Sequence, residues 1–473
     1  MRVWVYIVIM AAAFFQQHVA AQVITASEEL SFRNDDFYEL AGKLQDEYIV
    51  YRLRGGDHEL LFFDERLQLR RERQIFPSGN RQEPLAVKVR DSTIALCYIS
   101  REKEGGYALR VEQYSAFGLP LDTAIVSRYK YSSPSPEVAF SEDEQILLAY
   151  DVLYNKGVEV AAFHMGLMNP VWQRSIAFDN PDSPLDLEQV LVTNGAELFM
   201  VFDRNNQKGK IEEHHLDIFH FDYASDISQR IIIGMAEYLI TDARYAYDEL
   251  NDRVVGTGFV SQDNASRSDG IFYFGFDPAY PEGQSLSILE IPKSLISSIL
   301  STPAIQKDQS LEGLKAKNLV LRKDGGALLA AEITRVIERQ IASSGRMVSA
   351  NFSIDYYYED VLLLAIHPEG TLHWHSVLHK RQFSQDDNGI YSSFFMATTP
   401  EALRFVFNDE IRYENTVSEY VVNGLGRQFR SSVLSTENQK LRLRFSDAMQ
   451  VGPNELIVPS DFRNKLRLVR IRY

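Results

Sequence analysis

The chain has 473 residues, a length typical of about three average domains or of one large repeat fold. Lys and Arg number 49 and Asp and Glu number 65, so the formal net charge is −16. This acidic balance argues against a nucleic-acid-binding protein, which needs a basic surface for phosphate, and against docking on anionic membranes. The single cysteine, Cys97, excludes an intrachain disulfide and a cysteine-based metal site.

Residues 1–21 have the pattern of a secretory signal peptide. One arginine precedes an apolar run over residues 3–15, and small residues at 19–21 form a cleavage site before Gln22. The apolar run is shorter than the roughly 20 residues of a membrane span. No cysteine follows the cleavage point to carry a lipid anchor. We therefore expect an exported protein, periplasmic or extracellular, with an uncleaved N-terminal anchor as the alternative.

Short β-strands follow one another along the rest of the chain. β-Branched and aromatic residues form runs that are bounded by Gly, Asn, Asp and Pro. Some runs alternate with polar residues, whereas others, such as residues 361–366, are continuously apolar like strands buried on both faces. One short helix is expected from Pro292 to Ser301, where apolar residues recur at helical spacing.

A loose repeat organises these strands. Each unit has a polar strand A, a tight turn, an apolar strand B, a loop, a second apolar strand C, a short turn and an amphipathic strand D. The expected B strands begin near Tyr48, Ile94, Ile146, Leu198, Val254, Leu328, Leu403 and Leu456. The sequence therefore predicts an all-β protein, with residues 22–473 forming a single β-propeller domain of eight four-stranded blades. Seven blades are the alternative.

The two ends of the mature chain complement each other. The last unit ends at Tyr473 without a D strand, whereas a spare segment, "VITASEELSFR", precedes the first A strand. We expect a strand from about Val23 to Arg33 to pair with the C-terminal strand from Lys465 to Tyr473. This pairing closes the ring and removes an exposed sheet edge. A disordered N-terminal tail beside an irregular last blade is the alternative.

The long connections lie almost entirely between strands B and C or between strand D and the next A. Residues 205–213, 335–357 and 292–313 are examples, whereas the A–B and C–D turns are tight. In a four-stranded blade, the B–C and D–A connections emerge on the same face of the ring, which we call the loop face. Long loops on a rigid scaffold commonly hold binding residues, although neutral insertions give the same pattern.

Candidate ligand-binding residues follow B strands or close the longest connection on the loop face. They are Asp203, Arg204, Arg335, Tyr357, Asp409 and Glu410. Aromatic and carboxylate groups suit a protein, peptide or glycan ligand, and the acidic total charge favours a neutral or basic one. Core tyrosines beside solvated acids would explain the same pattern.

The sequence lacks a Gly-x-Ser-x-Gly elbow, a phosphate loop and a dinucleotide fingerprint. His373, His375 and His379 have spacings that could hold a metal, but strand alternation alone produces them and would leave all three facing solvent. We therefore expect a monomeric, non-enzymatic binding protein with no metal site and no cofactor. The alternative is a carbohydrate-active hydrolase or lyase, which would need a pair of carboxylates near the mouth of the central channel.

Residues 317–410 resemble a set of secreted bacterial β-propeller-like proteins that have no assigned activity. The shared marks are "LVLRKDGGALLAAE", a tyrosine-rich stretch, "HPEGTLHWHSVLHKRQFSQDD" and "FVFNDE". The resemblance implies secretion and a repeated β architecture. It carries no catalytic residue, ligand or cofactor over to this chain.

Overall fold

The structure is a computed structural model that describes most of the chain. The described residues are 22–33, 36–131, 133–153, 156–177, 186–300, 310–341, 351–409, 411, 416–435 and 441–473. The predicted signal peptide at residues 1–21 and the candidate binding residue Glu410 lie outside the described residues.

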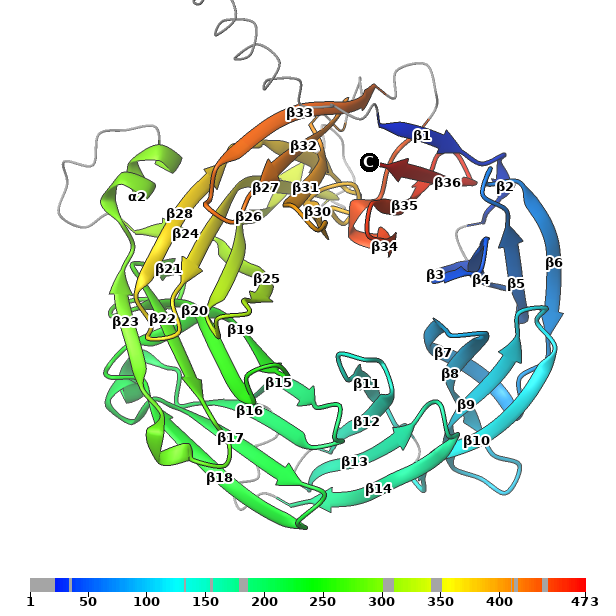
Figure 1. Ribbon diagram of the computed structural model, residues 1–473, viewed down its shortest axis with the longest axis horizontal. Helices are drawn as coiled ribbons and strands as arrows, with labels where there is room; N and C mark the ends of the chain where they lie inside the picture. Colours follow the sequence, from blue (N-terminus) through cyan, green and yellow to red (C-terminus); the bar gives the residue numbers. More distant parts are fainter. Residues whose placement is uncertain are drawn as a thin grey trace, which may run out of the picture.

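Eight antiparallel sheets follow one another around a ring, and the A strand of each sheet lies innermost (Figure 1). The first four blades run in chain order. Blade 1 contains β3 (Phe37–Leu44), β4 (Glu47–Arg54), β5 (Asp57–Phe63) and β6 (Leu69–Ile75), and blade 2 contains β7 (Asn80–Arg90), β8 (Thr93–Arg101), β9 (Tyr107–Ser115) and β10 (Pro120–Tyr129). Blade 3 contains β11 (Glu137–Phe140), β12 (Ile146–Leu153), β13 (Gly157–His164) and β14 (Asn169–Ile176). Blade 4 contains β15 (Leu187–Val192), β16 (Leu198–Arg204), β17 (His215–Asp222) and β18 (Ile227–Gly234).

The remaining blades continue the pattern, and the last one takes its outer strands from the N-terminus. Blade 5 contains β19 (Leu239–Asp248), β20 (Arg253–Ser261), β22 (Gly270–Phe276) and β23 (Leu286–Glu290). Blade 6 contains β25 (Leu314–Leu321), β26 (Ala327–Ile341), β27 (Asn351–Ile366), β28 (Leu372–Leu378) and the added β29 (Gln382–Gln385). Blade 7 contains β30 (Phe394–Thr398), β31 (Leu403–Asn408), β32 (Thr416–Val422) and β33 (Gln428–Ser435), and blade 8 contains β34 (Met449–Gly452), β35 (Glu455–Asp461), β36 (Lys465–Arg472), β1 (Val23–Ala26) and β2 (Leu30–Ser31). The predicted eight-bladed β-propeller is confirmed, and each expected B-strand start lies at or next to the start of a B strand.

Small elements decorate the connections. These are the two-stranded pair β21 (Arg267–Ser268) with β24 (Leu311–Glu312), the helix α2 (Lys293–Leu300), and the 3₁₀ turns η2 (Lys208–Glu213), η3 (Pro281–Gly283) and η4 (Phe445–Asp447). The predicted short helix near residues 292–301 is therefore confirmed as α2. Within the described part of the chain, no helix has the length and apolar character needed to cross a membrane.

The apolar core is distributed between neighbouring blades. Strand β12 is buried on both of its faces, because its sheet lies between two others. Ile146 and Leu148 pack toward blade 4, whereas Leu147 and Ala149 pack toward blade 2. This arrangement explains why B strands are continuously apolar, with no polar face to mark their alternation.

The ring closes as the sequence predicts. β1 pairs with β36 from Val23 opposite Arg472 to Ala26 opposite Val469, and β2 pairs with the start of β36. The predicted continuous strand is interrupted between β1 and β2. There the Ser27 amide donates to the Leu468 carbonyl at 2.8 Å, and the Ser27 hydroxyl accepts a hydrogen bond from the Leu468 amide at 2.9 Å.

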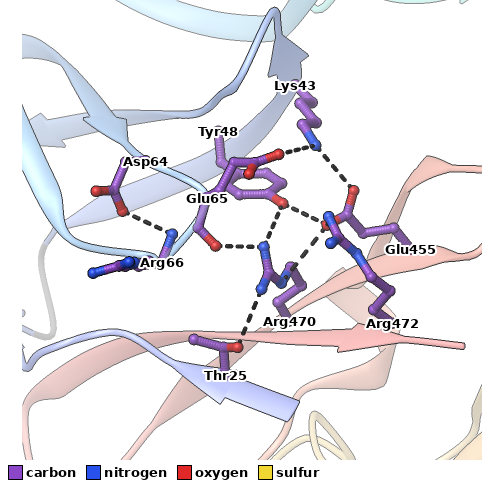
Figure 2. Close-up of polar contacts among 9 residues, drawn as sticks. All are labelled: Thr25, Lys43, Tyr48, Asp64, Glu65, Arg66, Glu455, Arg470 and Arg472. Carbon is purple, nitrogen blue, oxygen red and sulfur yellow. Dashed lines mark hydrogen bonds and ion pairs between the residues drawn. The ribbon is translucent and has the colours of Figure 1, made fainter. Parts of the chain in front are cut away.

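A network of charges strengthens this closure on the face of the A–B and C–D turns, which we call the turn face (Figure 2). Glu455 accepts hydrogen bonds from Tyr48 Oη at 2.5 Å, Lys43 Nζ at 3.1 Å and Arg472 Nη2 at 3.0 Å. Burial alone would raise the pKa of Glu455, but the Tyr48 hydroxyl and the charges of Lys43 and Arg472 hold it below its usual value. Arg470 donates to Thr25 Oγ1 at 3.2 Å, so the network joins both chain ends to blade 1.

The described ends of one expected loop are instead β-structure. Residues 335–357 were expected to form a long B–C loop, but Arg335 and Tyr357 are register partners within the long hairpin of β26 and β27. The segment after β28 adds β29 to this hairpin, with Tyr357 opposite Phe383. The β-branched and aromatic residues on both sides favour extended backbone, and the charged residues among them do not end the strands.

Candidate functional site

Asp203 and Arg204 end strand β16 and are held by neighbours in blade 4. Asp203 Oδ1 lies 2.7 Å from Nε2 of the fully buried His214, and its Oδ2 accepts a hydrogen bond from Asn206 Nδ2 at 2.6 Å. Arg204 pairs with Asp186, with Nη1 and Oδ2 2.9 Å apart. These contacts fix the B–C connection to the blade, a role that the sequence pattern did not reveal for His214.

Arg335, Tyr357 and Asp409 lie on blades 6 and 7. Arg335 Nη2 is 2.8 Å from Glu359 Oε2, and its guanidinium lies 5.5 Å from the centre of the Tyr357 ring. Asp409 pairs with Arg430 and accepts a hydrogen bond from the Ser418 hydroxyl. The five described candidates therefore belong to three different blades, and the contacts above join each of them to its own blade.

A cavity of about 520 Å³ lies where blade 8 meets blade 1, and we call it the seam cavity. It is lined by Phe32, Asp36, Phe37, Tyr38, Glu39, Leu40, Arg444, Asp447, Ala448 and Met449. Phe37 pairs with Leu53, at the end of β3 opposite the A–B turn. The cavity therefore lies at the loop-face end of β3. Figure 1 shows that β3 and β34 are the innermost strands of their blades.

One wall of the seam cavity is built around Arg444. Its Nη2 is 2.6 Å from Asp447 Oδ2, and its Nη1 is 3.2 Å from Asp461 Oδ2. The guanidinium also lies 5.6 Å from the centre of the Tyr38 ring, and Tyr38 Oη donates to Asp447 Oδ2 at 3.3 Å. Burial raises the pKa of Tyr38. The charge of Arg444 opposes this effect and the carboxylates of Asp447 and Asp461 add to it, so the phenol stays a neutral donor.

The other wall comes from the segment that enters blade 1. Asp36 is only 8% exposed, and its Oδ2 accepts a hydrogen bond from the Arg33 amide at 2.9 Å. Asp36 Oδ1 is buried and has no hydrogen-bond partner among the described residues. Burial raises the pKa of Glu39, against the opposing effects of a hydrogen bond from the Val87 amide and of the Lys88 charge.

Aromatic rings complete the cavity. Phe32 and Tyr38 meet edge to face with their centroids 5.3 Å apart, and Phe37 leaves 42% of its surface exposed. Four carboxylates and two guanidinium groups lie in or beside the cavity, which gives a formal net charge of −2. The carboxylates are those of Asp36, Glu39, Asp447 and Asp461, and the guanidinium groups are those of Arg54 and Arg444. An acidic cavity with aromatic walls is suited to a cationic group.

Two of the carboxylates that line the cavity, Glu39 and Asp447, lie on different sides of β3. Tyr38 and Glu39 are adjacent in β3, so their side chains point to opposite faces of the strand. Asp447 contacts Tyr38, whereas Glu39 contacts the backbone of blade 2 at Val87. The two acids therefore approach the cavity from opposite sides of β3.

The sequence analysis missed the seam cavity because its two halves lie at opposite ends of the chain. The segment "DFYEL" forms the start of the first A strand, β3, and "RFSDAM" leads into the last A strand, β34. They become neighbours only through ring closure. The predicted closure was the signal that could have brought them together.

No group of three or more His, Cys, Asp or Glu side chains in the described part of the chain is placed to hold a metal ion. The three histidines with metal-like spacing are exposed, as strand alternation predicts. His373 Nδ1 lies 2.9 Å from Arg322 Nη1, and His379 Nδ1 lies 3.2 Å from Asp360 Oδ2.

No family model and no curated protein matches the chain. Among solved structures, BamB from Moraxella catarrhalis is 12% identical, with 95% of this chain and 100% of that chain covered and a TM-score of 0.41. The protein lmo1340 from Listeria monocytogenes EGD-e is 9% identical over 76% and 86% of the two chains, with a TM-score of 0.38. The periplasmic gluconolactonase PpgL from Pseudomonas aeruginosa is 11% identical over 85% and 96%, with a TM-score of 0.36.

These similarities are too remote to transfer a function. The class of the protein follows from its own strand pairing, which defines an eight-bladed β-propeller. That architecture is also the one implied by the resemblance of residues 317–410 to secreted bacterial propeller-like proteins.

Proposed function

We propose that this chain is an exported, non-enzymatic binding protein that holds a protein or peptide partner on its loop face. The observation that carries the proposal is the seam cavity, which combines three aromatic side chains, a net negative charge and a position at the inner rim of the ring. The cavity lies between two blades that are fixed to each other by the closing strands. It therefore supplies a preformed anchoring point at a low cost in ordering.

The exposed residues among those predicted from sequence are proposed as outer contacts of the same partner. Arg335 and Tyr357 stand on the hairpin of β26 and β27, and Asp409 follows β31. Asp203 and Arg204 end β16, where their side chains are buried, so they would act by holding the B–C connection in place. A partner large enough to cover the loop face would reach several of these positions from the seam cavity. Glu410 remains in this set as a prediction.

The test is an array of basic, neutral and acidic peptides probed with the purified mature protein. Basic peptides are expected to bind best, because the cavity and the whole chain are acidic. The charge-reversed variant Asp409→Lys is expected to weaken binding several-fold. Asp143→Lys and Asp324→Lys, in A–B turns on the turn face, serve as matched controls and should bind like the wild type.

Asp203 is a less informative target than Asp409. A lysine at position 203 would be buried against His214, so lost binding there would not separate a lost contact from misfolding. If the turn-face variants lose binding while Asp409→Lys keeps it, the partner sits on the turn face and the proposal is wrong.

A carbohydrate-active enzyme is the second candidate, because three carboxylates line one cavity and burial raises the pKa of one of them, Glu39. A raised carboxyl pKa is what a general acid requires. Turnover of aryl glycosides by the wild type, lost in Glu39→Gln, would favour this candidate over the binding protein. The placement of Glu39 and Asp447 on opposite sides of β3 predicts no turnover.

A further inference from the structure

The hairpin of β26 and β27 leaves part of one sheet edge without a neighbouring strand. β25 pairs with β26 only as far as Ile333, and the Thr334 amide then donates to the Gly313 carbonyl at 2.8 Å. Beyond this point, residues 335–341 of β26 pair with β27 and with no other described strand. We call this segment the free edge. It lies at the loop-face end of blade 6, because β26 begins at the A–B turn of that blade.

The strand geometry shows which backbone groups the free edge presents. The Thr334 amide points to the β25 side, and from there to its end β26 pairs with β27 without a register shift. Since successive residues of an antiparallel strand point their N–H and C=O groups to opposite sides, those of Val336, Glu338 and Gln340 point outward. The carbonyl of Ile354, which lies opposite Glu338, accepts a hydrogen bond from the residue after β29, which fits the same alternation. Three donors and three acceptors in a row therefore have no partner in the part of the chain that the structure describes.

The side chains of the free edge also suit the addition of a strand. Val336 and Ile337 are 61% and 43% exposed, and β-branched residues favour extended backbone. No proline and no β-bulge blocks pairing between residues 335 and 341. Native sheets normally protect such an edge, and an edge left open can take up an extended peptide through main-chain hydrogen bonds.

A second copy of the chain is a poor match for the free edge. Antiparallel self-pairing brings outward-pointing residues opposite one another, so the registers that pair most of the segment are centred on Ile337, Glu338 or Arg339. A centre at Glu338 or at Arg339 places that charge opposite itself, and a centre at Ile337 places Arg335 opposite Arg339. Like charges directly opposite each other are destabilising. The free edge is therefore suited to a different strand.

The charges of the free edge define that strand. Arg335 Nη2 is 2.8 Å from Glu359 Oε2, and Arg339 pairs with Asp355, so β27 already balances both arginines. Glu338 is exposed and has no ion-pair partner among the described residues. A basic residue directly opposite Glu338 would supply that partner. Charge complementarity therefore favours a basic strand over an acidic one.

We infer that the free edge takes up an extended segment of the partner as an added antiparallel strand, with a lysine or arginine opposite Glu338. This inference rests on the proposed function, since the segment belongs to the partner held on the loop face. It goes further by naming the strand that receives the partner, the conformation of the bound segment and the charge it carries.

The first experiment separates backbone pairing from any other mode of binding. The probe is the heptapeptide acetyl-TVTKTVT-amide, whose two valines and lysine project to one side of a strand, and isothermal titration calorimetry measures its affinity. Methylation of the backbone nitrogens of the valines and the lysine removes the N–H groups that face the free edge, so affinity should fall at least tenfold. Methylation of the third and fifth residues removes only N–H groups that face away, and this matched control should bind like the unmodified probe.

Two variants of the chain test the same contact. Glu338→Lys should weaken binding of the probe several-fold and strengthen binding of acetyl-TVTETVT-amide, whereas Glu401→Lys, in an A–B turn on the turn face, should change neither. Val336→Pro removes one outward N–H and no bond of the hairpin, so it should weaken binding several-fold while the melting temperature stays close to that of the wild type.

Residue-resolved hydrogen exchange tests whether the edge is open. In the unbound protein the amides of Val336, Glu338 and Gln340 should exchange fast, those of Ile337 and Arg339 slowly, and the probe should slow the first three. Slow exchange of the first three without the probe would show that this chain or a second copy already covers the edge. That result, equal affinity of the two methylated peptides, or unchanged binding in both Glu338→Lys and Val336→Pro would each overturn the inference.

The outcomes also separate the two proposals. If basic peptides bind and Asp409→Lys weakens them, while Val336→Pro and Glu338→Lys bind them like the wild type, the proposed function holds and the inference fails. If the probe protects the amides of the free edge but Asp409→Lys binds all basic peptides like the wild type, the inference holds and the proposed function fails.

Discussion

Buried polar side chains near the ends of several B strands hold the connections of the loop face in place. Asp151 accepts hydrogen bonds from Tyr131 Oη at 2.8 Å and from the Ser135 amide at 3.1 Å. Asn408 donates to the carbonyls of Tyr391 at 2.8 Å and Leu443 at 2.9 Å. In each case the partner belongs to a D–A connection, so one side chain ties a connection to the blade beneath it.

Replacing Asn408 alone should therefore destabilise the protein. Asn408→Ala removes two buried hydrogen bonds and leaves two carbonyls without their donor, so the free energy of unfolding should fall by about 2–3 kcal/mol. Urea denaturation measures this change. The exposed Asn80→Ala in β7 is the control, and an equal loss in both variants would refute the anchoring role of Asn408.

Glu455 gives the ring closure a pH dependence with a definite sign. Because its folded pKa is below the ordinary value of 4.5, its ion pairs stabilise the fold fully above that pH. The stabilisation is lost as the pH falls through the folded pKa. The difference in unfolding free energy between the wild type and Glu455→Gln should therefore be largest at neutral pH and shrink below about pH 4.5. A difference that grows on acidification would contradict this account of Figure 2.

Among the elements of the fold, the N-terminal strands β1 and β2 give the clearest prediction, which is a loss of stability when they are deleted. β1 and β2 cover the outer edge of β36, and Leu30 packs in the same core cluster as Leu466 and Leu468. Deleting residues 22–33 exposes this edge and removes that burial, a loss of about 2–5 kcal/mol. The melting temperature of the whole ring should fall.

The control for the deletion is Glu28→Ala, which alters an exposed residue between β1 and β2 and should melt like the wild type. A truncated protein with an unchanged melting temperature would show that the ring does not depend on these strands.

The elements that could be predicted from sequence are those whose pattern comes from burial. Continuous apolar runs such as β12 were sufficient to predict the blades. The missing D strand of the last unit was sufficient to predict how the ring closes. The hairpin of β26 and β27 was missed because its outer part has few burial constraints. Val336 and Ile337 are exposed there, and charged residues interrupt the alternation.

The candidate site was predicted only as far as its face. Asp203 lies at the end of a B strand and Asp409 directly follows one, positions that are visible in the sequence. Their partners His214 and Arg430 come from other strands or loops. The seam cavity depends on Asp36 and Arg444, which meet only because the ring closes. Such contacts across the whole chain have no local sequence signal.

For the whole molecule, the proposal predicts export, and export with cleavage also changes the net charge. Removal of residues 1–21 takes away one positive charge and changes the formal net charge from −16 to −17. Mature protein recovered from outside the cytoplasm should begin at Gln22, as N-terminal sequencing will show. An intact N-terminus at Met1 in the membrane fraction would contradict the predicted cleavage.

The central claim is that the loop face binds its partner through the seam cavity. Its most direct test is a crystal structure of the protein with a bound basic peptide. The account predicts that the peptide lies on the loop face and places a basic side chain in the seam cavity, against Phe32 and Tyr38. An empty seam cavity, with the peptide bound only on the turn face, would contradict it.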